Sequence, residues 1–191
     1  MQATEQVDPA QVRADRWSAS LHPALVRGCE LVRAGLVTDA VDELGELRGS
    51  GELPDDDLAQ VLLRATLLDA RLARGELTEA LALGVELTPY LDLPGLPGAL
   101  AHHSRGDLST ALGEHDFAAA HFESAGLRTT PDAEDPELVP WRAGAALAAV
   151  RRGRLPEASA LARAHHEVAL AHMRHFASEV APKVRETVGA A

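Results

Sequence analysis

The chain has 191 residues, of which 46% are hydrophobic and 3% aromatic, and its formal net charge is −11. This acidic balance argues against direct nucleic-acid binding, because proteins that bind phosphates need clustered cations. The longest purely apolar run, 145–150, is far shorter than a membrane span of roughly 18 residues, and the first nine residues lack a secretion signal, so we expect a cytoplasmic protein without membrane contact.

Helix-period patterns and breaks predict one all-α domain, 1–191, divided into three parts. These are an N-terminal cap (1–18), four helix-turn-helix repeats (19–165) and a C-terminal capping helix (166–191). Expected helices in chain order are 21–33, 36–48, 56–74 and 77–87, then a third unit over 98–126 and a fourth over 136–165. The two Pro-Gly pairs of 91–98 are expected to lie outside a helix, and Asp135-Pro136 predicts the start of one.

One short phrase recurs four times at nearly even spacing. Its copies are 35–40, 75–80, 115–120 and 153–158, and their last residues, all alanines, are 40, 40 and 38 residues apart. A fixed period of about 20 to 50 residues is typical of stacked repeats, in which each unit buries its apolar face against a neighbour. The glycine that opens three of the copies fits a left-handed helix C-cap.

The four units resemble the tetratricopeptide repeat, with a longer period than usual. In that pattern the small residue of the second helix falls at Ala40, Ala80, Ala120 and Ala158. The small residue of the first helix falls at Gly28, while the later units depart from the pattern with Leu68, Leu108 and Ala146. The resemblance implies a solenoid with a concave groove lined by the first helix of each unit.

A narrower resemblance covers the second half of the chain. The stretches 114–122, 135–142 and 152–158 resemble the tetratricopeptide segment of large LuxR-type ATP-binding transcriptional regulators of actinobacteria. Lys183 lies outside a phosphate-binding Gly-x-x-x-x-Gly-Lys motif, and no second DNA-reading helix follows Ala158. The resemblance therefore implies a sensor or interaction segment and transfers no ATP or DNA site.

The repeat pattern also indicates which side chains face the groove. The tetratricopeptide groove positions correspond to His22, Leu25, Cys29 and Val32; Leu62, Ala65, Asp69 and Leu72; His102, Arg105, Ser109 and Leu112; and Pro140, Ala143, Leu147 and Val150. From these we predict a ligand site with Asp69, His102, Arg105 and Ser109 as polar contacts and Leu62, Leu72 and Leu112 as its apolar wall. The alternative is a solvated groove with an Arg–Asp pair between helices.

Histidines near the C-terminus raise the possibility of a metal site. His172 and His175 share a helix face, and His165 and His166 precede them, but one helix cannot supply the convergent third or fourth ligand. We therefore predict no metal, no cofactor and no catalytic residue, and we interpret Cys29 as a packed thiol.

Three functions fit this sequence. The leading hypothesis is a non-enzymatic module that recognises a peptide, a protein partner or a small apolar effector in its groove. The second is a small enzyme or cyclase that uses the groove as a reaction chamber, with His102, Asp69 or Arg105 as acid, base or anion stabiliser. The third is a structural adaptor that forms homo-oligomers through its ends. A closed pocket with converging pKa-shifted groups would favour the enzyme.

Overall fold

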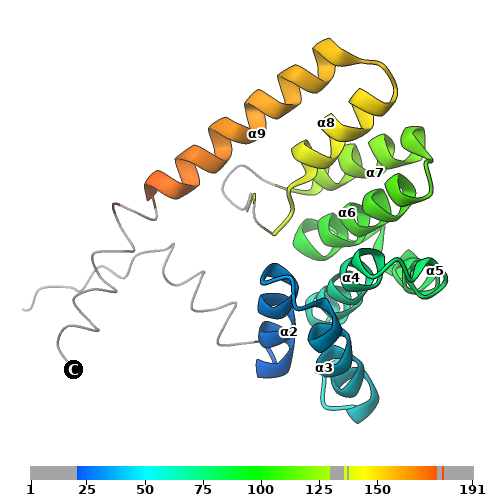
Figure 1. Cartoon of the computed structure of the whole chain (residues 1–191). Helices are drawn as coiled ribbons and strands as arrows, with labels where there is room; N and C mark the ends of the chain where they lie inside the picture. Colours follow the sequence, from blue (N-terminus) through cyan, green and yellow to red (C-terminus); the bar gives the residue numbers. More distant parts are fainter. Residues whose placement is uncertain (1–20, 130–135, 137, 176–177, 179–191) are drawn as a thin grey trace, which may run out of the picture.

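The computed structural model describes residues 21–129, 136, 138–175 and 178, and within them the chain is all-helical with no strand (Figure 1). The elements are α2 (Pro23–Arg33), α3 (Val37–Ser50), α4 (Asp57–Ala73), α5 (Leu77–Glu86), a short 3-10 helix η1 (Thr88–Tyr90), α6 (Gly95–Ala111), α7 (His115–Arg128), α8 (Trp141–Arg151) and α9 (Leu155–His175). The predicted all-α class is confirmed. The predicted N-terminal cap and most of the predicted C-terminal capping helix lie outside the described residues, and α9 runs without a break across residue 165.

The same tight turn joins the two helices of each pair. In the first pair, the N–H of Gly35 donates to the carbonyl of Val32 (3.0 Å), and the N–H of Leu36 donates to the carbonyl of Leu31 (2.9 Å). The turns after α4, α6 and α8 repeat this pair of hydrogen bonds. The glycines at the four turns have φ between 75° and 77°, a left-handed conformation that a side chain would strain. Each first helix therefore ends at a glycine, in a Schellman motif.

These turns correct the predicted position of the third phrase. Its glycine is Gly113, so the copy is 113–118 rather than 115–120, and its alanine is Ala118. Ala118 is fully buried, like Ala40 and Ala80, whereas the predicted Ala120 is exposed. The alanines are therefore 40, 38 and 40 residues apart, and the third unit lies two residues away from where the sequence analysis placed it.

The corrected register also restores a small residue in the first helix of the third pair. Gly106, not Leu108, becomes the equivalent of Gly28. An added Cβ at Gly28 would lie 2.3 Å from Leu44 of α3, and one at Gly106 would lie 2.6 Å from Phe122 of α7. In both pairs, a glycine thus lets a bulky side chain of the second helix approach the backbone of the first.

The helices form two rows. The first helices α2, α4, α6 and α8 contact one another in sequence, and each also packs on the second helix of its pair. The second helices α3, α5, α7 and α9 make at most marginal contacts with one another. The first helices therefore form a continuous row, which we call the inner row, and we call the second helices together the outer row. We use "inner face" for the side of the inner row that is turned away from the outer row.

The core is built mainly from leucine and alanine. A large cluster, which includes Leu25, Leu44, Leu68 and Leu87, extends from α2 to α7, and a smaller one surrounds Phe122 between α7 and α8. Small side chains allow helices to approach closely at interior packing density. Within the described ranges, no helix combines the length and apolar character that crossing a bilayer requires.

Two helix starts differ from their predicted positions. The helix α6 begins at Gly95, so Pro97 and Gly98 lie in its first turn, where a missing N–H costs no intrahelical hydrogen bond. Gly98 is needed there because an added Cβ would lie 1.9 Å from the carbonyl oxygen of Leu93. The helix α8 begins at Trp141 rather than at Pro136.

The start of α4 offers a test of helix capping. The Asp56 carboxylate accepts a hydrogen bond from the N–H of Ala59 (3.0 Å). Because an N-cap satisfies an otherwise unpaired N–H, Asp56→Ala is expected to lower the free energy of unfolding by about 0.5–2 kcal/mol in urea titrations. Asp55→Ala, which removes the neighbouring exposed carboxylate, is the matched control. Equal decreases in the free energy of unfolding of the two variants would show that the loss of a negative charge, and not the loss of the N-cap hydrogen bond, is responsible.

Candidate functional site

The structure does not bring the predicted ligand contacts together. Arg105 donates from Nη1 to the carbonyl of Gly84 in α5 (2.9 Å), and His102 Nδ1 lies 3.0 Å from His121 Nδ1 in α7. Both side chains therefore face the outer row, and Ser109 is buried. This is a consequence of the register error, since a two-residue shift rotates a helix by roughly 200°. The fourth predicted polar contact, Asp69 of α4, interacts instead with His103 and Asp107 of α6.

The predicted apolar wall is also dispersed. Leu62 is buried in the large core cluster, Leu72 packs against that cluster, and Leu112 is partly exposed at the C-terminal end of α6. Substitution of Arg105 would break the contact between α6 and α5.

The corrected register assigns a different set of α6 residues to the groove positions of the repeat pattern. The positions equivalent to Leu62, Ala65, Asp69 and Leu72 are Leu100, His103, Asp107 and Thr110. His103 Nδ1 lies 3.0 Å from Asp107 Oδ2, one helical turn along, and the His103 ring meets the edge of Phe122 with ring centroids 5.4 Å apart. Asp69 of α4 interacts electrostatically with both His103 and Asp107. We call these three residues the Asp69–His103–Asp107 cluster.

The electrostatics of this cluster are unusual. Burial, with a further contribution from the negative charge of Asp107, raises the pKa of Asp69 to about 7, although His103 acts in the opposite direction. Burial alone would lower the pKa of His103, but the hydrogen bond and charge of Asp107, together with the charge of Asp69, outweigh it and raise that pKa. The cluster therefore exchanges protons near neutral pH and carries two carboxyl groups for one imidazole.

Asp69 has no polar partner of its own. It is half-buried, and within the described residues it makes no hydrogen bond or ion pair. In the adjacent helix, Cys29 Sγ lies 3.3 Å from Thr66 Oγ1, and Asp69 acts on the Cys29 thiol by charge alone. A carboxyl group that is partly removed from water and has no donor is more costly to ionise, which is why its pKa is raised.

The histidine pair on the other side of α6 has a different role. Burial lowers the pKa of His102, and burial together with the charges of His102 and Arg105 lowers the pKa of His121 to about 4. At neutral pH both rings are therefore neutral, and the short Nδ1–Nδ1 distance requires one ring to donate and the other to accept. The pair links α6 to α7 within the stack. This contact was not predictable from the sequence pattern.

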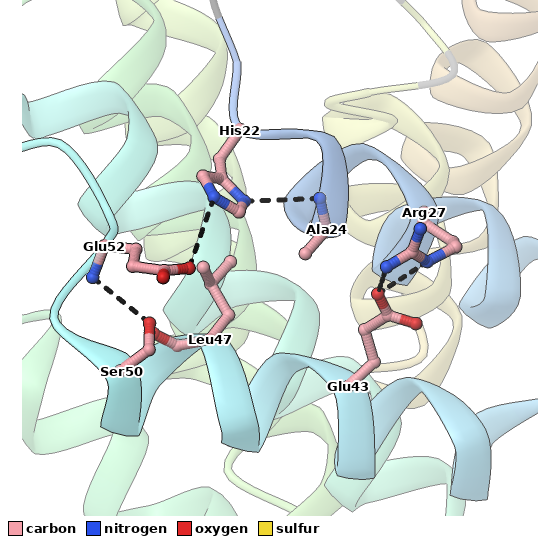
Figure 2. Close-up of polar contacts among 7 residues, drawn as sticks. All are labelled: His22, Ala24, Arg27, Glu43, Leu47, Ser50 and Glu52. Atoms are coloured by element: carbon pink, nitrogen blue, oxygen red, sulfur yellow. Dashed lines mark hydrogen bonds and ion pairs between the residues drawn. The ribbon is translucent and has the colours of Figure 1, made fainter.

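His22, a predicted groove residue, lies at the edge of the first pair (Figure 2). Its Nδ1 accepts a hydrogen bond from the N–H of Ala24 (3.3 Å) and caps α2, while Nε2 lies 3.9 Å from Glu52 Oε2. Nearby, Arg27 of α2 pairs with Glu43 of α3 (Figure 2). These contacts hold α2 against α3 and the following loop. His22 therefore has a structural role.

Two surface hollows lie away from the Asp69–His103–Asp107 cluster. One, of about 330 Å³, is bounded by α7, α8 and α9, and the other, of about 230 Å³, by α3, α4 and α5. The first hollow is lined by alanines and by Glu123 and Glu157. Across the described ranges, no three His, Cys, Asp or Glu side chains are arranged to hold a metal ion.

The raised pKa of Asp69 predicts the pH dependence of stability. Its folded pKa of about 7 lies above the unfolded value near 4, so the stability that the bound proton contributes is lost as the pH rises between these values. Asp69→Asn, which is neutral at every pH, is therefore expected to stabilise the fold by about 1 kcal/mol at pH 8 and by less at pH 5. This stabilisation is smaller than the full pKa shift multiplied by about 1.4 kcal/mol per pKa unit, because part of the Asp69 side chain is in contact with water.

The matched control for this prediction is Asp42→Asn, which removes an exposed carboxylate from α3 in the outer row. Its effect is expected to stay within about 0.5 kcal/mol at both pH values. Urea unfolding at pH 5 and pH 8 measures both variants. If Asp69→Asn gains no more than Asp42→Asn at pH 8, the Asp69 carboxylate is not destabilised in the fold.

Comparison of the chain with protein-family models, with curated proteins and with solved structures finds no match. Function is therefore inferred from the inner face itself.

Proposed function

We propose that the chain is a non-enzymatic, tetratricopeptide-like helical-repeat module that binds a peptide segment of a partner protein on its inner face. The observation that carries this proposal is the row of side chains at equivalent positions of the four inner helices. In chain order the row is Cys29, Asp69, Asp107 and Leu147. The row crosses four helices in succession, so an extended segment laid along it would contact every pair.

The chemistry of the row suits a segment with both apolar and polar side chains. At the α8 end, Leu147 and Val150 lie close together on one helix and are 46% and 48% exposed, so they offer a small apolar surface. In the middle, α6 presents His103 and Asp107 beside Asp69 of α4. An apolar anchor region next to a few placed polar groups is the usual composition of a recognition surface.

The resemblance to the repeat segment of LuxR-type regulators agrees with this proposal, since it implies a sensor or interaction role. The enzyme alternative loses two of its three proposed groups, because His102 and Arg105 face the outer row. Its remaining group, Asp69, belongs to the cluster that the binding proposal uses.

A displayed library of random twelve-residue peptides tests the proposal. Peptides enriched on the wild-type protein are titrated against Leu147→Asp, which places a charge on the inner face, and against Leu127→Asp, the matched control on α7. Leu127 is 86% exposed in the outer row, so the control adds the same charge to a distant surface. We expect Leu147→Asp to weaken binding by about tenfold or more, and Leu127→Asp to leave it within about twofold.

Circular dichroism and urea unfolding check that both variants keep the fold. Failure of the library to yield any binder, or binding that Leu147→Asp leaves unchanged, would reject the inner face as the recognition surface.

A further inference from the structure

The two surface hollows occupy equivalent places in the repeat. We call them the α7–α9 hollow and the α3–α5 hollow. Gly113 lies 78 residues after Gly35, and Gly153 lies 78 residues after Gly75, so a shift of 78 residues aligns the last two helix pairs with the first two. The α7–α9 hollow is lined by Glu123, Ala145, Glu157, Ala160, Leu161 and Ala164. Each of these residues lies 78 positions after a residue that lines the α3–α5 hollow.

The α3–α5 hollow is crossed by an ion pair. Arg48 of α3 lies with its Nη2 2.7 Å from Oε1 of Glu86 in α5, and both residues line the hollow. Arg71 of α4 lines it as well and pairs with Glu76. The charges of this hollow are therefore balanced within the chain. Such an arginine covers apolar surface with its aliphatic part while its guanidinium reaches a carboxylate.

The α7–α9 hollow lacks both of these arginines. Gly126 stands at the position of Arg48, and Ala149 stands at the position of Arg71. The chain has no room for an arginine at position 126, because even an added Cβ there would lie 2.7 Å from Trp141. Without the two long side chains the hollow has a volume of about 330 Å³, against about 230 Å³ for its equivalent.

Carboxylates stand on both sides of this larger hollow, Glu123 on α7 and Glu157 on α9. Glu157 pairs with Arg154 of the preceding turn at 3.4 Å, whereas Glu123 makes no hydrogen bond or ion pair among the described residues. The surface between them is made of alanines and a leucine. An apolar hollow with an unbalanced negative charge at its edge is complementary to a side chain that has an aliphatic part and a cationic end.

We propose that the α7–α9 hollow binds an arginine side chain of a partner protein, in the way that the α3–α5 hollow holds Arg48. The aliphatic part of the partner's arginine packs on the alanines, and its guanidinium, which has donors on several sides, donates to Glu123 and Glu157. The chain's net charge of −11 attracts a basic partner and repels a second copy of itself. The hollow lies between two helices of the outer row, so this site is independent of the inner face.

The test isolates ligands of this hollow with a variant that fills it. A displayed library of random twelve-residue peptides is selected on the wild-type chain and then depleted on Ala160→Arg, which places the chain's own arginine in the hollow at an exposed position of α9. The matched control is Ala82→Arg, the exposed equivalent in the α3–α5 hollow. We expect the remaining peptides to share an arginine and to bind Ala82→Arg within about twofold of the wild type.

Synthetic peptides then test the charge of that arginine. Citrulline has almost the shape of arginine and no charge, and we expect it to weaken binding to the wild type by about tenfold. Glu123→Gln is expected to weaken binding of the arginine peptide by about fivefold and to reduce the effect of citrulline to about twofold. Glu46→Gln, which removes an exposed carboxylate from α3, is expected to change neither value by more than about twofold.

Several outcomes would overturn the proposal. These are depletion that leaves no peptide, remaining peptides without arginine, and an effect of citrulline that stays tenfold in Glu123→Gln. If every selected peptide is lost on Leu147→Asp and none on Ala160→Arg, this site is rejected while the proposed function stands. A wild-type dimer in sedimentation velocity that Ala160→Arg dissociates and Ala82→Arg preserves would assign the hollow to a second copy of the chain instead. Circular dichroism and urea unfolding check that all four variants keep the fold.

Discussion

Replacing Phe122 by alanine is expected to lower the free energy of unfolding by about 3–5 kcal/mol. The side chain is 1% exposed and is the largest in the small core cluster between α7 and α8. Its ring lies against two glycines, Gly106 of α6 and Gly144 of α8, at which an added Cβ would come within 2.6 Å and 2.4 Å of it. Truncation would open a cavity where three helices meet, and their glycines offer no side chains to fill it.

Phe117→Ala in the same helix is the matched control, because Phe117 is 65% exposed. Its expected effect is within about 0.5 kcal/mol. Urea unfolding monitored by circular dichroism measures both variants. If the two substitutions lower the free energy of unfolding equally, Phe122 is not the side chain on which α6, α7 and α8 pack.

Ala118→Leu is expected to destabilise the fold by about 1–3 kcal/mol, whereas Ala120→Leu is expected to change stability little. Ala118 is fully buried in the small core cluster around Phe122, where three additional carbon atoms would have to displace neighbours. Ala120 is exposed two residues later in the same helix. Leucine and alanine have similar helix propensities, so the difference between the variants reports packing.

Ala80→Leu should behave like Ala118→Leu, because Ala80 is the fully buried equivalent in the second pair. A shift of the urea midpoint in Ala120→Leu and none in Ala118→Leu would restore the register first expected from the sequence.

The sequence predicts the fold class and the turns better than it predicts the site. Glycine followed five residues later by alanine marks all four turns, and this signal was present at Gly113 and Ala118. The three consecutive alanines at 118–120 allow two alignments of the third phrase with the other copies. An alignment that leaves out the glycine places the phrase two residues too late. With Gly113 as the anchor, the sequence alone assigns His103 and Asp107 to groove positions of the repeat pattern.

Other parts of the candidate site depend on packing between helices that are distant in the chain. The contact of His102 with His121 is set by the rotation of α7 against α6, and the environment of Asp69 by how far α4 and α6 approach. The raised pKa of Asp69 follows from enclosure, which no local pattern records. The partial removal of Asp69 from water is therefore a feature of the candidate site that the sequence pattern does not predict.

The marginal contact between consecutive outer helices has a mechanical consequence. Bending the stack changes the spacing of the outer helices, which have few direct contacts with one another to resist the change. Consecutive pairs are held together by the first helix of each pair, which packs on both helices of the preceding pair, most extensively where α8 packs on α7. Bending should therefore pivot each pair about its first helix. Small rotations at each pair would add up along the stack, so that its two ends move farthest.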